Sequence, residues 1–526
     1  MQGHERLLAT PRINRSIRKW RQNRSSTIAI VAIALALATF TWLSVVFSPA
    51  RSHLQEWQGS PLAFPWEPFG HDEEEEAQDQ DSGSMAITGN MTGAFMHSTD
   101  RSKRSFKAGN LSLDQVVFGI GGSAQYWDKR KEFVKLWFEP QRMRGFVWLE
   151  EPVKPDPLDA LPPVKLSDDI SRFAYTNPKG HPSGVRIARV VQETFRLGLQ
   201  NVHWFVLGDD DTVFNVHNLI RVLSKYDPSE MHYIGSPSES HSANAYFSQN
   251  MAFGGGGIAI SYPLAEVLSN MEDACLERYA ELYGSDDRLH ACISELGIPL
   301  TREPGFHQWD VRGNAFGLLA GHPVAPFVSM HHLEAVDPVF PQHNSLDGLK
   351  LLVKAMKTEP TSFLQRSICY DHKRRLSFSV SNGYVVQVFP KIILPRELDR
   401  VERTFKAWNR RDRADDFDID TRAPYKSICS KPFLFFLKDV HNVGGSKIVS
   451  YYKRDNVSNN LNRRAFCLSS ALPVHETQEI EVVSRPMPSQ WHLLPRRQCC
   501  KLKETKNKVL GLTVGPCAQG KSRYIL

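Results

Sequence analysis

The sequence predicts an α/β fold in which a parallel β-sheet is covered by helices on both faces. Between residues 113 and 236, short apolar segments alternate with segments whose apolar residues recur at helical spacing. The short segments are almost wholly apolar, which is typical of strands buried on both faces. Because parallel strands need long crossover connections, this alternation favours a parallel sheet. Ligands of such sheets bind outside the carboxyl ends of the strands.

Each element is assigned from its local pattern. The segment from Ser183 to Gly198 has its apolar residues on one helical face, with Ser183 at an N-cap position and Gly198 where a helix would end. The other elements are, in chain order, a strand at 114–122, a helix at 124–138, strands at 144–150 and 203–208, a helix at 215–226 and a strand at 231–236.

The net charge of +7 does not indicate a nucleic-acid partner. The first 27 residues contain seven basic side chains and one acidic one, so they account for most of the excess. The rest of the chain is nearly neutral, which argues against an extended basic surface. With 526 residues, 41% of them hydrophobic, the chain is long enough for two domains with ordinary cores.

An uncharged apolar run follows the basic tail. As a helix, residues 27–47 would span roughly 30 Å, the thickness of a bilayer core. The cations before this run predict that residues 1–26 stay in the cytosol and that the bulk of the chain faces the secretory lumen. A cleaved signal peptide is the alternative, but its apolar region is usually only about 7–15 residues long.

Three regions are predicted beyond this anchor. Residues 48–110 are rich in proline and charge and poor in branched apolar residues, so we expect a flexible stem. Residues 111–341 would form the α/β domain. Residues 342–526 would form a β-rich, disulfide-bonded module, since strand-like segments occur at 375–390 and 432–440 and six of the eight cysteines lie there.

The eight cysteines are predicted to form disulfides, because all lie beyond the anchor and their number is even. A bond between Cys275 and Cys292 would brace the segment between them. A zinc site is the alternative, but no CxxC pair occurs. Glycosylation sequons at Asn90, Asn110 and Asn456 agree with a lumenal location.

Three consecutive carboxylates, Asp209, Asp210 and Asp211, follow the apolar strand at 203–208. Aspartates can serve as turn and helix-cap residues, which explains one or two of them. Three adjacent charges repel one another and raise some of their pKa values unless a cation is present. A hard divalent ion suits carboxylate ligands and often shares its coordination shell with substrate phosphates.

Two further segments carry candidate site residues. The glycines at 254–257 allow close approach of the backbone to a ligand, although a flexible loop is the alternative. Ser285, Asp286 and Asp287 begin a helix that runs to Gly297. These acids suit a helix N-terminus, yet an ionised carboxylate can also accept a proton from a substrate hydroxyl.

His331 and His332 follow a short apolar strand. Histidines at strand ends are usually surface or hydrogen-bonded residues. A neutral imidazole can also complete the coordination of a divalent metal.

In their order and spacing, WFVLGDDDTVF, FGGGGIAIS, SDDRLHACIS and SMHHLEAVDP resemble the fringe-like β-1,3-glycosyltransferases, and most closely the plant branch of fringe-related proteins. The resemblance covers roughly residues 113–341. It implies a Rossmann-like, GT-A type domain behind a single N-terminal signal anchor in the Golgi membrane. It also implies an inverting transfer of a hexose-type sugar from a UDP-sugar to a glycan or glycoprotein acceptor, with Mn²⁺ as cofactor.

The resemblance assigns the metal and donor residues. Asp211 would hold Mn²⁺, with Asp210 positioning the nucleotide sugar and contributing to the metal site, and Asp209 would belong to the donor site. The family's metal-binding histidine matches His332, with His331 as a substitute.

The acidic pair would supply the catalytic base, with Asp287 preferred to Asp286. Gly254, Gly255 and Gly256 would lie against the donor. The chain departs from the family pattern here, because many relatives have a shorter glycine stretch that contains alanine. Trp137 matches a tryptophan that the family uses in packing.

Two other functional classes fit parts of the pattern. A catalytically inactive carbohydrate-binding or scaffolding protein would keep the fold and anchor but lose site residues, whereas this chain retains all of the motifs. A metal-dependent hydrolase would need only an activated water near Asp211. Neither the donor sugar nor the acceptor follows from the sequence.

Overall fold

In the computed structural model, the described residues are 111–154, 158–409, 413, 416–459, 467, 474, 476–503 and 508–517. All of them belong to one unit, Thr99–Leu526. The predicted cytosolic tail, anchor and stem lie outside the described residues. Within the part of the chain that the structure describes, no helix is long and apolar enough to cross a bilayer.

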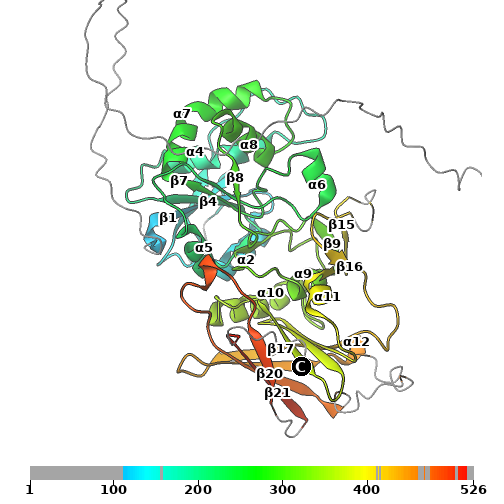
Figure 1. Cartoon of the computed structure of the whole chain (residues 1–526). Helices are drawn as coiled ribbons and strands as arrows, with labels where there is room; N and C mark the ends of the chain where they lie inside the picture. The colour runs from blue at the N-terminus through cyan, green and yellow to red at the C-terminus, as the bar shows by residue number, and fades with distance from the viewer. Residues whose placement is uncertain are drawn as a thin grey trace, which may run out of the picture. The chain divides into compact units, whose positions relative to one another are not determined.

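A seven-stranded sheet forms the centre of the N-terminal half (Figure 1). Its strands, in spatial order, are β3 (Val164–Leu166), β2 (Arg144–Leu149), β1 (Val116–Gly121), β4 (Trp204–Asp209), β7 (Ile258–Ser261), β6 (Tyr233–Gly235) and β8 (Leu300–Arg302). The first four strands are parallel, as predicted. In contrast, β7 is antiparallel to both β4 and β6, so the expectation of a wholly parallel sheet is wrong at this strand.

The direction of β7 follows from where the chain enters it. The glycine run at 254–257 lies at the carboxyl end of β4, where Thr212 Oγ1 donates a hydrogen bond of 2.8 Å to the Gly255 carbonyl. A strand that starts at this edge must run back across the sheet, and it is therefore antiparallel to β4.

Side chains alternate between the two faces of the sheet, as the pleat requires. Along β1, Val116, Phe118 and Ile120 join one apolar core, whereas Val117 joins the other. The first core is covered by α2 (Trp127–Trp137) and α5 (Val216–Leu223), and the second by α3 (Ser183–Ala188), α4 (Val190–Phe195), α7 (Tyr262–Arg278) and α8 (Ser285–Glu295). The predicted covering of both faces by helices is confirmed.

The helix predicted for residues 183–198 is interrupted at Arg189, where α3 ends and α4 begins. Ser183 is the first helical residue, and Pro182 rather than Ser183 occupies the N-cap. Gly198 adopts a φ of +65°, a left-handed conformation that ends the helical segment as predicted.

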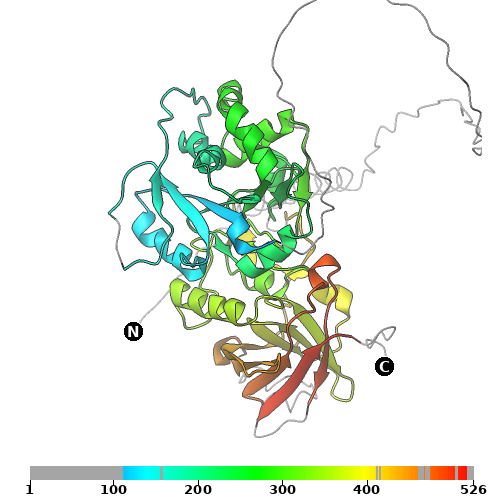
Figure 2. The same cartoon turned by 90° about the vertical axis from the view of Figure 1, so that its left-hand side faces the viewer.

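The C-terminal half is built around a closed eight-stranded barrel (Figure 2). Its strands, in spatial order, are β11 (Arg366–Asp371), β12 (Leu376–Ser381), β13 (Val385–Phe389), β17 (Phe433–Asn442), β18 (Ile448–Arg454), β19 (Glu479–Ser484), β21 (Val509–Gly515) and β20 (Cys499–Leu502). Closure leaves no free sheet edge.

Disulfides brace both halves of the chain. The pairs are Cys275–Cys292, Cys369–Cys500, Cys429–Cys467 and Cys499–Cys517. The first joins α7 to α8, as predicted. Because all eight cysteines are paired, a cysteine-ligated zinc site is excluded.

The two halves share one continuous apolar core. Phe316 and Phe340, which precede the predicted boundary at residue 341, contact Tyr384 and Phe436 beyond it, with ring centroids 5.4–6.2 Å apart. The barrel is therefore packed directly on the α/β half.

The remaining elements of the described residues lie outside the seven-stranded sheet, its covering helices and the barrel. They are η1 (Leu113–Gln115), β5 (Val213–Phe214), α6 (His241–Tyr246), β9 (Val311–Gly313), α9 (Phe316–Ala320), β10 (Ser329–Met330), α10 (Ser345–Thr358), α11 (Pro395–Asp399), β14 (Val401–Glu402), β15 (Phe405–Ala407), β16 (Thr421–Arg422), α12 (Asn456–Asn459) and η2 (Trp491–Leu493). Two pairings matter for the site: β5 with β10, and β9 with β15.

We expect Trp137→Ala to lower the free energy of unfolding by about 3–5 kcal/mol, because it opens a cavity in the first core. The indole packs against Phe118 and Phe214, with ring centroids 5.1 and 5.0 Å away. Urea denaturation of residues 99–526, followed by far-ultraviolet circular dichroism, measures this change. Leu394→Ala is the control, since that side chain is 63% exposed and should alter stability by less than ~0.5 kcal/mol. A loss below 1 kcal/mol for Trp137→Ala would contradict the assigned packing role.

Candidate metal and donor site

The aspartate triplet lies at the carboxyl end of β4, where the chain turns into β5 and α5. Other side chains cap this turn. Thr212 Oγ1 accepts a hydrogen bond from the Asp209 amide at 2.9 Å, and Asn215 Oδ1 accepts one from the Asn218 amide at the start of α5. The helix-cap explanation of the triplet is thus unnecessary, and its carboxylates are available for other partners.

The pairing of β5 with β10 brings His331 to the triplet. Met330 pairs with Val213, so the residue that follows β10 lies beside the residues that precede β5. His331 Nε2 lies 3.1 Å from Asp211 Oδ1 and 3.4 Å from Asp209 Oδ2. One ligand atom from each of these three residues lies within 4.8 Å of the other two.

This group of Asp209, Asp211 and His331 fits a divalent cation. Asp211 Oδ1 is buried, and its polar neighbour is His331 Nε2, which lies 3.1 Å away without the alignment of a hydrogen bond. Burial would raise the pKa of Asp211, but His331 and Arg130 outweigh it and hold that pKa well below the usual value. Two carboxylates and an imidazole suit Mn²⁺ or a similar ion.

The remaining member of the triplet, Asp210, has a different partner. Arg130 on α2 places Nη1 2.7 Å from Asp210 Oδ1 and Nη2 3.6 Å from Asp211 Oδ2. Burial raises the pKa of Asp210 to about 6, although Arg130 opposes this shift. Asp210 therefore lies beside an arginine rather than within the three-residue group.

His332, the preferred histidine in the sequence analysis, also lies outside this group. Its backbone adopts a left-handed φ of +55°. His332 Nδ1 lies 3.2 Å from Asp310 Oδ1, and the ring stacks on Trp408 at a centroid distance of 4.2 Å. The structure thus places His331 against the carboxylates of Asp209 and Asp211. His332 contacts the His331 ring on the side of Asp310 and Trp408 instead.

Steric limits explain the run of glycines. A Cβ on Gly254 would lie 2.5 Å from Asp286 Oδ1, and one on Gly255 would overlap the His331 ring. The Gly256 amide donates a hydrogen bond of 2.7 Å to Gln308 Oε1. The three glycines predicted to contact the donor therefore pack against site residues.

The two acids of α8 point in different directions. Asp286 lies against Gly254 and accepts a hydrogen bond from Ser285 Oγ at 3.1 Å. Burial and the nearby Asp209 raise the pKa of Asp286 to about 7. Asp287 instead accepts a hydrogen bond from the Tyr283 amide at 3.4 Å, and burial raises its pKa. Asp286 is thus the acid that faces the candidate metal ligands.

A cleft of about 1100 Å³ opens next to these residues, at the carboxyl ends of β1 and β4. Asp209, Asp210 and Arg130 line one part of it, and Ser285 lines another. The volume suits a nucleotide-sized ligand, and the position is the one expected for ligands of this class of sheet.

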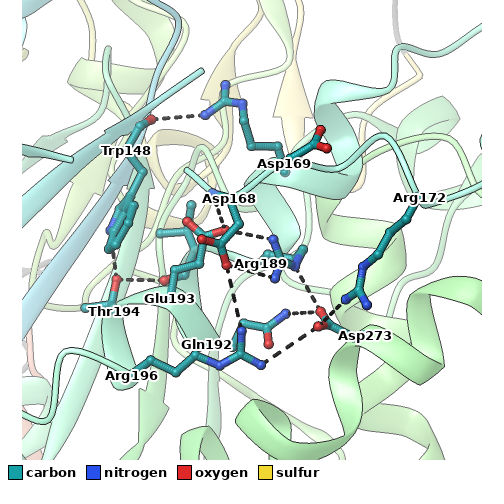
Figure 3. A network of polar contacts seen from close by, with 12 residues as sticks. Trp148, Asp168, Asp169, Arg172, Arg189, Gln192, Glu193, Thr194, Arg196 and Asp273 are labelled. Atoms are coloured by element: carbon teal, nitrogen blue, oxygen red, sulfur yellow. Dashed lines mark hydrogen bonds and ion pairs between the residues drawn. The ribbon is translucent and has the colours of Figure 1, made fainter. Parts of the chain in front are cut away.

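A charged network behind the cleft holds one of its walls (Figure 3). Asp168 lines the cleft, and Nη2 of Arg189, which lies between α3 and α4, is 3.2 Å from its carboxylate. Arg189 Nε also donates to Asp273 on α7 at 2.9 Å, and Nη1 donates to Glu193 at 3.0 Å. The loop carrying Asp168 is thereby tied to two helices.

Several residues of the site had no local pattern that could reveal them. They are Arg130, Gln308, Asp310 and Trp408, which contact the triplet, the glycines or the histidines only through the tertiary fold, and Arg189, which contacts the cleft residue Asp168 in the same way. An alternation of apolar residues cannot indicate such contacts. In contrast, the sequence motifs at 331–332 and 286–287 did predict which segments contribute residues to the site.

A Fringe-like family model matches residues 111–313. A second family model, described as a protein of unknown function, DUF604, matches residues 243–500. The first contains the triplet, the glycines and the acidic pair, whereas His331 lies in the second. The resemblance to the fringe-like family is therefore confirmed; the fourth segment, at residues 329–338, lies only in the second match, and the likeness to the plant branch stays a prediction.

Curated relatives include beta-1,3-glucosyltransferases of mouse (Mus musculus) and human (Homo sapiens). They are 31% identical over 107 residues and 33% identical over 105 residues, respectively. Each match covers 20% of this chain, and the chain spans only about a fifth of each relative, 21% and 20%. The apo crystal structure of mouse xyloside xylosyltransferase 1 has a TM-score of 0.25 and 10% identity, over 36% of this chain and 85% of that one.

We expect Gly255→Ala to weaken Mn²⁺ binding by tenfold or more, because the added methyl group displaces the His331 ring. Electron paramagnetic resonance of free Mn²⁺ in titrations of the purified chain measures the affinity. Gly515→Ala is the matched control, since a Cβ there meets nothing within 4 Å. Equal affinities in both variants would show that His331 is not a ligand.

Proposed function

We propose that this chain, which belongs to the fringe-like family over residues 111–313, is an inverting, metal-dependent glycosyltransferase. It would move a hexose-type sugar from a UDP-sugar to a hydroxyl of a glycan or glycoprotein. The observation that carries the proposal is the meeting of Asp209, Asp211 and His331 beside a nucleotide-sized cleft, with Asp286 facing them.

Asp209, Asp211 and His331 would hold the divalent cation. When bound, such an ion stabilises the negative charge that develops on the departing diphosphate. The carbonyl of Gln308 lies 3.3 Å from His331 Nδ1 and orients the ring so that Nε2 faces the carboxylates.

Asp210 and Arg130 would position the donor. Asp210 lines the cleft and is held by Arg130 Nη1 and by the Ser123 amide, which lies 3.4 Å from Oδ2. A Cβ on Gly122 would lie 2.8 Å from the same oxygen, so the glycine allows this carboxylate to approach the backbone.

Asp286 would act as the general base. It lies next to the candidate metal ligands, and burial together with the nearby Asp209 raises its pKa to about 7, near the range that suits proton transfer at neutral pH. The acceptor hydroxyl would lose its proton to Asp286 and attack the anomeric carbon opposite the leaving diphosphate. One displacement inverts the configuration. Asp287, bonded to the Tyr283 amide, would have a structural role.

We further propose a location in the Golgi membrane, with a single N-terminal anchor and a lumenal catalytic domain. The basic tail and the apolar run at 27–47 support this orientation. Four disulfides support an oxidising compartment.

A screen of the purified chain against UDP-sugars, with and without Mn²⁺, tests the proposed function. We expect Mn²⁺-dependent release of UDP from one donor and transfer of its sugar to added glycan acceptors. Asp211→Asn should abolish the Mn²⁺-dependent reaction while leaving the circular dichroism spectrum unchanged. Nucleotide binding without turnover of any donor would favour the inactive carbohydrate-binding alternative, and hydrolysis without transfer would favour a hydrolase.

Asp286→Asn should reduce transfer by about 10²–10⁴-fold while retaining UDP and Mn²⁺ binding, because only the proton acceptor is lost. Asp287→Asn is the matched control and should retain most of the activity. In the wild-type chain, transfer should rise with pH across the pKa of Asp286, which is about 7 before a cation neutralises Asp209, since Asp286 must be deprotonated to act. If Asp287→Asn instead lost activity and Asp286→Asn kept it, the base would be Asp287.

A further inference from the structure

Trp408 is an exposed aromatic side chain at the edge of the candidate site. It is 41% exposed, and no other tryptophan in the described ranges is among the exposed large hydrophobic residues. Tryptophan is enriched at binding interfaces, because its ring system combines a large apolar surface with one N–H donor.

A ladder of three rings connects Trp408 to the metal ligands. The indole stacks on His332 at a centroid distance of 4.2 Å and an interplanar angle of 13°. The His332 ring in turn lies 3.9 Å from the ring of His331, which contacts Asp209 and Asp211. Trp408 is therefore two ring contacts away from a candidate metal ligand.

The backbone that carries Trp408 is held firmly against the α/β half. β15 pairs with β9, and Ala407 is opposite Val311. Arg312 Nε and Nη2 donate hydrogen bonds of 3.2 and 3.1 Å to the Ala407 carbonyl. The strand pairing and these hydrogen bonds thus fix the position of the Trp408 backbone beside the site.

His332 is held in place for this contact. Its left-handed φ of +55° is uncommon for a residue with a side chain, and such strain is concentrated at functional sites. Asp310 lies 3.2 Å from His332 Nδ1 and accepts a hydrogen bond of 2.6 Å from Ser238 Oγ. The His332 ring is therefore held by Asp310 at Nδ1 and by Trp408 on one face.

We propose that Trp408 is the platform on which a pyranose ring of the acceptor glycan rests. This proposal deepens the proposed function and rests on it. A pyranose ring has an apolar C–H face that packs on an aromatic ring and a polar edge that seeks hydrogen bonds, so an indole next to hydrogen-bonding side chains suits it.

Polar groups beside the ladder can bind the edge of such a ring. Asp310 lies two residue contacts from Trp408, through His332, and Asp209 and Asp211 lie three contacts away, through His332 and His331. A carboxylate can accept a hydrogen bond from a sugar hydroxyl. Neutral glycosides, which are rich in such hydroxyls, are therefore suitable probes of the platform.

The experiment compares the wild-type full chain with three variants, in a detergent without a sugar headgroup. Saturation-transfer NMR and calorimetric titrations use a panel of neutral methyl glycosides in the presence of UDP and MnCl₂. Trp408→Ala should weaken binding of the best glycoside by about tenfold or more, as loss of a central aromatic contact does. Trp408→Phe should retain most of the binding, and Leu494→Ala, an exposed residue of the same half, should change nothing.

Affinities for UDP and Mn²⁺, measured separately, distinguish the two proposals. The platform is overturned if Trp408→Ala binds the glycoside as tightly as the wild type, or if no glycoside binds to a chain that does bind UDP and Mn²⁺. If a glycoside binds through Trp408 but UDP and Mn²⁺ do not bind, the platform stands and the transferase proposal fails. Equal UDP affinity in all variants also shows that Trp408→Ala is folded.

Discussion

Three adjacent carboxylates at the end of a buried strand must be neutralised, and the architecture of the site follows from that requirement. The structure divides the triplet between two positive partners. Arg130 on α2 forms an ion pair with Asp210. His331, which follows β10, lies within ion-pair distance of Asp209 and Asp211. As a result, Asp209, Asp211 and His331 form a group suited to a cation, while Asp210 faces the donor cleft. It also explains why no side chain is tolerated on Gly255, since the imidazole fills that space.

The C-terminal half takes part in the site as well as in the core. Its barrel is packed on the α/β half through Phe316, Phe340 and their partners, so its approach is fixed. The C-terminal half also places Trp408 against His332. The two family models overlap at residues 243–313, but His331 lies only in the second and Asp209 and Asp211 only in the first, so neither match alone contains the complete metal group. We therefore propose that the C-terminal half, through the segment that follows β15, is a determinant of acceptor binding in the proposed reaction.

Much of the fold could be predicted from local sequence, because burial on both faces of a strand leaves an apolar run and burial of one helix face leaves a helical period. The direction of β7 could not be predicted from local sequence, because it depends on the contact between Thr212 and the glycine run at the end of β4. Within the site, the motifs located the right segments. The choice between neighbours, such as His331 and His332, depends on backbone torsions that residue identity does not reveal. Arg130 has no motif, because it reaches the triplet from a separate helix.

The central claim is that Asp209, Asp211 and His331 form one cation site at the end of β4. Crystals grown with MnCl₂ and UDP, with diffraction data collected at the manganese absorption edge, test it most directly. The account predicts an anomalous peak at coordination distance, roughly 2.0–2.6 Å, from one atom of each of these three residues, with the diphosphate on its open side. A site without such a peak, or a peak held by Asp210 and His332 instead, would contradict it.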